Sequence, residues 1–116
     1  MLRGRIRKFG RTTDQRRAFL RSLARSLILK EKITTTEARA KELRKFVEPM
    51  VTRGRLDTLA SRRLILSNLG GDERATRKLV QKISPRYKER AGGYLRVLKM
   101  RQRKGDGSPM AVIEFV

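Results

Sequence analysis

The sequence predicts an α+β fold, in which several helices pack with a small three-stranded sheet and an extended basic N-terminal arm precedes them. Apolar residues recur at three- and four-residue spacing from residue 12 to residue 83, as in helices that bury one face. After Ala91-Gly92-Gly93 the composition shifts to the β-branched, aromatic and apolar residues that strands prefer. A chain of 116 residues can bury one core. We therefore expect a basic extension at residues 1–11 and a single α+β domain at residues 12–116.

The first segment, residues 1–11 (MLRGRIRKFGR), has the composition of an extended arm. It combines five Arg or Lys residues and two Gly residues with isolated apolar side chains. Such a segment cannot bury enough apolar surface to form a core. We expect it to stay unfolded until an anionic partner neutralises it.

A first helix is predicted from Thr12 to about Lys30. Thr12 and Gln15 have the spacing of a capping box, and a stripe of Leu, Ile and Ala residues follows. Like charges at four-residue spacing destabilise an isolated helix, so an anion or salt has to offset them. The residues with this spacing, which should share one face away from the apolar stripe, are Arg17, Arg21 and Arg25.

Three more helices are predicted, each after a residue that can cap its first turn. These caps are Thr36, Thr58 and Asp72. Pro49 falls inside the second apolar stripe, and because the stripe continues past it we expect a kink rather than an early end. Gly70-Gly71 should end the third helix and Ser84-Pro85 the fourth.

Three segments are predicted as strands: residues 32–35, 94–101 and 110–116. The last two should form a hairpin across a long basic loop at residues 102–109, where Gly105-Asp106-Gly107 supplies turn residues. Strict alternation fails in residues 94–101, so the pattern leaves the buried face of that strand open. With residues 32–35 the hairpin makes the expected three-stranded sheet.

The net charge of +20 is concentrated in two segments. Residues 1–30 hold ten basic residues and one acid, for +9, and residues 86–104 hold eight basic residues and one acid, for +7. The remaining residues contribute only +4. Self-repulsion among so many cations opposes compaction, and a polyanion that binds the folded chain would offset it. The distribution therefore favours a binding surface for nucleic acid over a solvated basic face.

Several classes of function are excluded by composition. The chain has no Cys and no His, which removes Ser-His and Cys-His catalysis, disulfides and the usual zinc sites. No apolar window approaches the ~18 residues of a membrane span, and the N-terminus has no secretory apolar region, so a cytoplasmic location is expected. The acidic residues suit helix starts and surface pairing better than a metal-dependent nuclease site. We expect no enzyme activity, no cofactor, no metal and no small-molecule substrate.

Arg outnumbers Lys by 21 to 10, which suits bidentate contacts with phosphate. Gly92-Gly93-Tyr94 has two interpretations: a close approach to phosphate with Tyr94 stacked on a base, or a plain helix-to-strand turn. The loop at residues 101–107 is either an ordinary turn or a phosphate contact. The predicted contact residues are Arg3, Arg5, Arg7, Lys8, Arg11, Arg16, Arg17, Arg21, Tyr94, Arg96, Arg101, Arg103 and Lys104.

Charge alone does not separate RNA from DNA. Two rivals to an RNA-binding protein therefore remain at this point: a DNA-binding architectural or regulatory protein, and an enzyme that uses carboxylates on nucleic acid.

An ordered series of short motifs along nearly the whole chain resembles one family, ribosomal protein seventeen of the bacterial large subunit. The motifs include Gly10-Arg11-Thr12, Arg16-Arg17-Ala18, Ile33-Thr34-Thr35-Thr36, Pro85-Arg86-Tyr87, Gly92-Gly93-Tyr94, Gly105-Asp106 and Pro109-Met110-Ala111. Where the family typically has His, near its start and before the Arg that matches Arg16, this sequence has Arg3 and Gln15.

The resemblance implies an α+β structural constituent of the large ribosomal subunit, whose basic N-terminal extension penetrates the RNA. It implies binding to large-subunit ribosomal RNA near the nascent-chain exit region through the basic arm, an Arg-rich helix face and a basic hairpin. The implied partners are that RNA and neighbouring large-subunit ribosomal proteins, in the cytoplasmic ribosome. Residues 12–116 would then be the RNA-binding domain.

Overall fold

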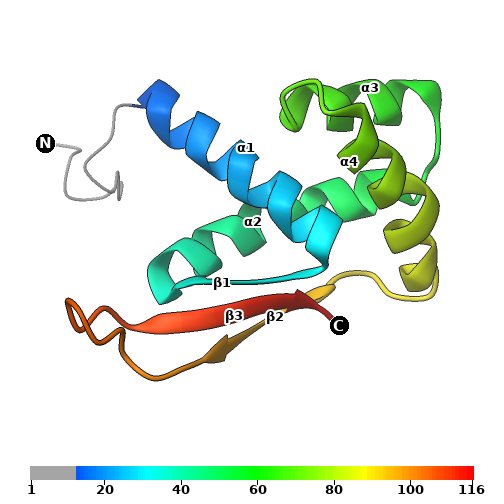
Figure 1. Cartoon of the computed structure of the whole chain (residues 1–116). Coiled ribbons are helices and arrows are strands. Elements are labelled where there is room, and N and C mark those ends of the chain that lie inside the picture. Colours follow the sequence, from blue (N-terminus) through cyan, green and yellow to red (C-terminus); the bar gives the residue numbers. More distant parts are fainter. Residues whose placement is uncertain (1–12) are drawn as a thin grey trace, which may run out of the picture.

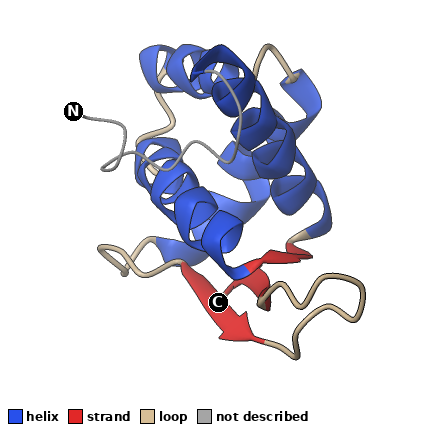
Figure 2. Cartoon of the chain, turned by 90° about the vertical axis from the view of Figure 1, so that its left-hand side faces the viewer, coloured by secondary structure: helices blue, strands red, loops and turns tan. Residues whose placement is uncertain are grey.

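Helices cover one face of a three-stranded antiparallel sheet in residues 13–116, the part of the chain that the computed structural model describes (Figures 1 and 2). The elements in chain order are α1 (Thr13–Lys30), β1 (Lys32–Thr36), α2 (Glu37–Gly54), α3 (Leu59–Asn68), α4 (Glu73–Lys78), the π-helical turn η1 (Leu79–Ile83), the 3-10 turn η2 (Ser84–Tyr87), β2 (Leu95–Lys99) and β3 (Met110–Phe115). The predicted α+β class with a small three-stranded sheet is confirmed. The predicted arm at residues 1–11 and the cap at Thr12 lie outside the described residues.

The last strand lies in the middle of the sheet, because the strand order is β1-β3-β2. The predicted hairpin of β2 and β3 is confirmed, and the register also settles which face of β2 is buried. Val97 lies opposite Ile113, which is fully buried, whereas Leu98 lies opposite Val112 and is 47% exposed. Alternate residues of a strand point to opposite faces. The Val97 side of the sheet therefore faces the helices, and the Leu98 side is open.

The core lies between α1, α2 and the inner face of the sheet. α1 and α2 supply its largest share, and side chains of this kind stabilise the fold by roughly 1.5–3 kcal/mol each when fully buried. The buried apolar residues of these two helices are Leu20, Ala24, Leu27, Ile28, Ala40, Leu43, Val47, Met50 and Val51. Their spacing is the three- and four-residue repeat from which the helices were predicted.

The three predicted caps that fall in the described chain are all confirmed. The side chains of Thr36, Thr58 and Asp72 accept hydrogen bonds from the backbone N–H three residues later, at 3.4, 3.1 and 3.0 Å respectively. α1 ends at Lys30 as expected, and α2 continues through Pro49 to Gly54. Gly70 and Gly71, both at positive φ, follow the end of α3. Glycine adopts this backbone conformation without steric cost.

The expected end of the fourth helix at Ser84-Pro85 is wrong. The α-helical part stops earlier, at Lys78, and the chain remains helical through η1 and η2. Pro85 sits in the first turn of η2, where a residue without an N–H donor is tolerated. Ser84 is fully buried, and its hydroxyl donates to the Val51 carbonyl of α2 at 3.1 Å. This tertiary contact holds the segment in helical form across the proline.

No helix in residues 13–116 combines the length and the apolar character needed to cross a membrane.

Candidate nucleic-acid interface

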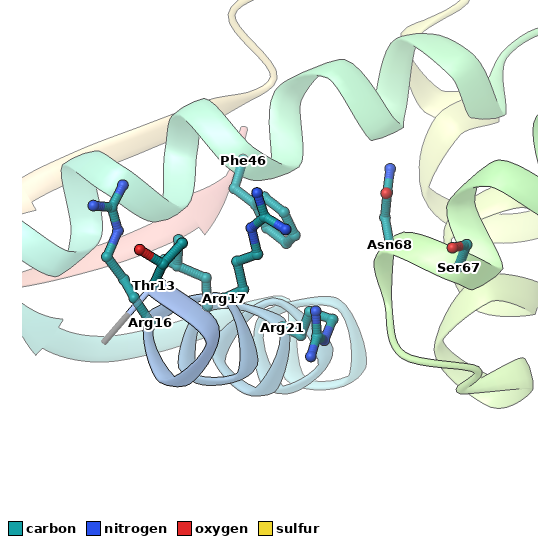
Figure 3. Close-up of a pocket in the computed structure, with 8 residues that line it drawn as sticks. Thr13, Arg16, Arg17, Arg21, Phe46, Ser67 and Asn68 are labelled. Carbon is teal, nitrogen blue, oxygen red and sulfur yellow. The ribbon is translucent and has the colours of Figure 1, made fainter. Parts of the chain in front are cut away.

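The arginines at the start of α1 line a hollow of about 540 Å³ between α1, α2 and the end of α3 (Figure 3). The buried apolar side chains of α1 and α2 hold two of its walls together. Its lining residues are Thr13, Arg16, Arg17, Leu20, Arg21, Phe46, Ser67 and Asn68. This set contains three guanidinium groups, two hydroxyls and an amide, and no acidic side chain. It can donate several hydrogen bonds to one anion.

The three guanidinium groups of the hollow differ in how well they are neutralised. Arg16 lies 3.9 Å from the carboxylate of Glu42 on α2, which is a long, partly exposed ion pair. Within residues 13–116, no acid lies within 4.0 Å of Arg17 or Arg21. Arg17 is exposed and Arg21 half-buried. Two charges in this hollow are therefore available to an anionic ligand.

Arg25 shares the predicted Arg face of α1 but has a structural role. Its Nη1 donates to the Leu69 carbonyl at 3.0 Å, and its Nε lies 3.9 Å from Asp72. A Cβ on Gly70 would come within 2.9 Å of Arg25 Nη1, so the glycine turn is what lets the guanidinium approach. Arg25 thus fastens α1 to the turn that joins α3 to α4.

The basic hairpin is partly neutralised by its own acids. Arg96 donates through Nε and Nη2 to one carboxylate oxygen of Glu114, at 3.1 and 2.8 Å. Arg103 makes a two-pronged contact with Asp106 at 3.0 and 2.7 Å, and this hydrogen bonding holds the pKa of Asp106 well below its usual range. Arg101 and Lys104 are exposed and have no ion pair within the described part of the chain.

Tyr94 does not face solvent, so the expectation that it stacks on a base is wrong for the described structure. Its side chain is fully buried, and its ring lies 5.1 Å from that of Tyr87. Its hydroxyl accepts from Arg55 Nη1 at 3.1 Å and donates to the Arg90 carbonyl at 3.2 Å. The alternative interpretation, a structural Tyr at the start of a strand, describes the observed environment.

Part of each basic segment lies on the same side of the molecule, and the start of α2 lies between the two parts. Figure 1 shows the start of α1, the start of α2 and the loop between β2 and β3 on the same side. Printed contacts connect them: the Arg16–Glu42 pair joins α1 to α2, and the Glu37 N–H donates to the Pro109 carbonyl at 2.9 Å. The described contact candidates therefore fall into two neighbouring groups, on α1 and on the hairpin. The predicted arm residues lie outside the described residues: Arg3, Arg5, Arg7, Lys8 and Arg11.

Sequence reasoning missed five residues of the hollow: Thr13, Leu20, Phe46, Ser67 and Asn68. Phe46 belongs to the apolar stripe of α2 and gave no sign of a half-open position. Ser67 and Asn68 are ordinary polar residues near a helix end. They reach the hollow because α3 packs back on α2, which is a tertiary arrangement with no local signal.

The described residues offer no grouping of three or more acidic side chains that could hold a metal ion. The arrangement is suited to binding an anion by charge and by directed hydrogen bonds. Guanidinium groups are the side chains that best match phosphate oxygens in this way.

Comparisons with known proteins find close relatives over almost the whole chain. Residues 19–116 match the family described as "Ribosomal protein L17". The sequence is 54% identical to the large ribosomal subunit protein bL17 of Caldanaerobacter subterraneus over 110 residues, which cover 95% of this chain and 97% of that protein. It is 51% identical to bL17 of Staphylococcus carnosus, with coverage of 95% and 98%, and 48% identical to bL17 of Shouchella clausii, with coverage of 94% and 97%.

Proposed function

The chain belongs to the ribosomal protein L17 family, and we propose that, as a structural constituent of the large ribosomal subunit, it binds large-subunit ribosomal RNA. Its relatives are ribosomal proteins rather than enzymes, and they place it in the cytoplasmic ribosome. Its partners are the RNA and neighbouring large-subunit proteins.

The observation that carries RNA binding is the hollow beside α1. Arg17 and Arg21, which have no acidic partner among residues 13–116, share it with hydroxyl and amide donors. A phosphate group in this space would receive charge-assisted hydrogen bonds from both arginines. The hairpin adds Arg101 and Lys104 at the same end of the molecule, with Arg96 and Arg103 beside them in ion pairs.

The proposed interface joins three parts: residues 1–11, the α1 hollow and the hairpin, with residues 12–116 as the RNA-binding domain. Tyr94 is left out because it is buried. These contacts would be made mainly with phosphates and would recognise the shape of folded RNA rather than its base sequence. By the family resemblance, the site on the subunit is near the nascent-chain exit.

The test replaces Arg17 and Arg21 together by Gln and measures the dissociation constant for large-subunit ribosomal RNA at several salt concentrations. If the whole chain engages six to ten phosphates, the log–log salt slope of the wild type should be roughly −5 to −9. The double variant should bind more weakly, with a slope shallower by about 2.

The matched control replaces Arg44 and Arg53, which are exposed on α2 and unpaired within the described chain, by Gln. This control removes the same charge and should leave the slope unchanged. A wild-type slope near zero contradicts the proposal. Equal wild-type affinity for duplex DNA and for ribosomal RNA would favour the rival DNA-binding protein.

A further inference from the structure

A second group of cations lies on α4 and η1, away from the interface proposed above. These residues surround a hollow of about 300 Å³ lined by Leu29, Arg74, Arg77, Lys78, Gln81 and Lys82. The lining combines four cations with one amide and one apolar side chain, and it contains no acid. These four cations lie outside both basic segments of the sequence, residues 1–30 and 86–104.

Only one of the four cations is used by the fold. Lys78 donates to the Leu29 carbonyl at 2.7 Å and pairs with Glu31 at 3.2 Å. Arg74, Arg77 and Lys82 are exposed, and within residues 13–116 no acid lies within 4.0 Å of them. Glu73, the acid next to them in sequence, lines the neighbouring hollow on the α3 side, which Arg77 also borders.

This cluster of cations destabilises the protein when no anion is bound. Three of the cations follow each other at four-residue spacing: Arg74, Lys78 and Lys82. At this short distance on a helical surface, like charges repel one another. Arg74 and Lys78 lie on the six-residue α4, and Lys82 lies on the π-helical turn η1 that directly follows it, a backbone form common at functional sites. An anion bound in the hollow would remove the repulsion. Nothing in the packing of the described chain requires Arg74, Arg77 or Lys82, because all three side chains are exposed.

The cations of α4 lie at the other end of the molecule from the first interface. Figure 1 shows α4 on the side opposite the start of α1 and the loop between β2 and β3. The described molecule measures 43 Å along its longest axis. A single phosphate group cannot reach both surfaces, so each surface would take its own stretch of RNA backbone.

We propose that the α4–η1 surface, formed by Arg74, Arg77 and Lys82, is a second phosphate-binding surface through which the protein bridges two segments of ribosomal RNA. The inference rests on the proposed function, since it takes folded RNA as the ligand. The anchored Lys78 would fix the inner wall of the hollow, while the three exposed cations contact phosphates.

The test compares four full-length proteins on a large-subunit ribosomal RNA transcript: the wild type, the α4 triple variant (R74Q, R77Q, K82Q), the α1 double variant (R17Q, R21Q) and a dispersed triple control (R44Q, R53Q, K88Q). Affinity, salt slope and the hydroxyl-radical footprint on the RNA are measured for each. The α4 variant should lose about tenfold or more in affinity, with a slope shallower by up to ~3. It should lose protection of one RNA segment and keep the other, which the α1 variant loses.

The dispersed control removes the same charge from exposed positions and should keep both protected segments. An α4 variant that behaves like this control, while the α1 variant is weakened, overturns the second surface and leaves the proposed function standing. A wild type that does not bind the RNA overturns both. Thermal unfolding of each variant checks that loss of binding is not loss of folding, because removing repelling charges from α4 should preserve or raise the melting temperature.

Discussion

Glu31 connects more elements than any neighbour in its stretch of chain, although it lies in the one-residue gap between α1 and β1. Its backbone has a φ of +66°, which is uncommon for a residue with a side chain. Its carbonyl accepts from the Phe115 N–H at 3.2 Å, and its carboxylate contacts Arg86 at 2.5 Å and Lys78 at 3.2 Å. The side chain of Glu31 thus connects the end of α1 to α4 and η2, and its backbone carbonyl connects it to the central strand.

The carboxylate of Glu31 should make folding stability depend on acid pH. The hydrogen bond from Arg86 lowers the pKa of Glu31 from 4.5 to about 2; burial opposes this shift and Lys78 adds to it. The stabilisation is therefore present above pH 4.5 and is lost as the pH falls toward 2. Glu31→Gln should lower the free energy of unfolding at pH 7 by about 1–2 kcal/mol, after allowance for solvent screening. It should also weaken the dependence of that free energy on pH in the acid range.

Denaturant unfolding between pH 2 and 7 measures this effect, with Glu89→Gln as the control. Glu89 is exposed and has no ion pair within the described chain. If the free energy of unfolding depends on pH in the same way in the Glu31 and Glu89 variants, the ion pairs of Glu31 contribute nothing to stability.

Single residues also show where reasoning from sequence stops. Arg17, Arg21 and Arg25 have the same type and spacing, but among the partners in residues 13–116 only Arg25 meets a backbone carbonyl and an acid. Tyr94 follows a Gly-Gly pair that suits either a turn or a phosphate contact, and its buried hydroxyl meets Thr52 and Arg55, which lie 42 and 39 residues earlier in the sequence. Residue type predicted what these side chains can do, whereas their partners are set by the tertiary fold.

At the scale of elements, the end of α2 packs tightly against the start of η2. Gly54 is buried at the last position of α2, and a Cβ built on it would lie 2.3 Å from Ser84 Oγ and 3.1 Å from Ser84 Cβ. Ser84 cannot easily turn away, because its hydroxyl donates to the Val51 carbonyl. The absence of a side chain at residue 54 lets the two elements touch.

Gly54→Ala should therefore destabilise the fold by about 1–3 kcal/mol, as expected for overpacking, despite the better helix propensity of Ala. Thermal or urea unfolding measures the change. Gly105→Ala is the control, because no atom lies within 4 Å of a Cβ at that position. Adding Ser84→Ala to the Gly54 variant should recover part of the loss, and a Gly54 variant as stable as the Gly105 variant would refute this account.

Elements were predictable where their signals are local. Thr36, Thr58 and Asp72 cap their helices through contacts three residues away, which a linear pattern records. The change from the α-helix α4 to the turns η1 and η2 was not predictable from sequence. It depends on the contact of Ser84 with Val51 of α2, 33 residues earlier. The buried face of β2 likewise follows from its pairing with β3 and not from its own alternation.

At the scale of the whole molecule, the net charge of +20 determines how strongly the surface groups repel one another. Most acids near the core are already paired, as with Glu31, Glu42 and Glu114. The surplus therefore lies on exposed cations, which repel one another at low ionic strength.

Raising NaCl from about 20 mM to about 500 mM should raise the melting temperature of the free protein, because salt screens this repulsion. If screening contributes ~1 kcal/mol, the rise should be about 4–8 °C. Circular dichroism against temperature measures it. Salt should have the opposite effect on the RNA complex. Its melting temperature should fall over the same range of NaCl concentration, because the phosphate contacts weaken. A free protein that melts lower in high salt would show that the surface charges do not govern its stability.

The strand order has a consequence for how the protein is made. Because β3 lies between β1 and β2, both outer strands wait for residues 110–115 before either can pair. A nascent chain that stops short of residue 110 carries two strands with unsatisfied edges and an apolar side of α2 that no sheet covers. The sheet therefore closes only when residues 110–115 are available to both outer strands.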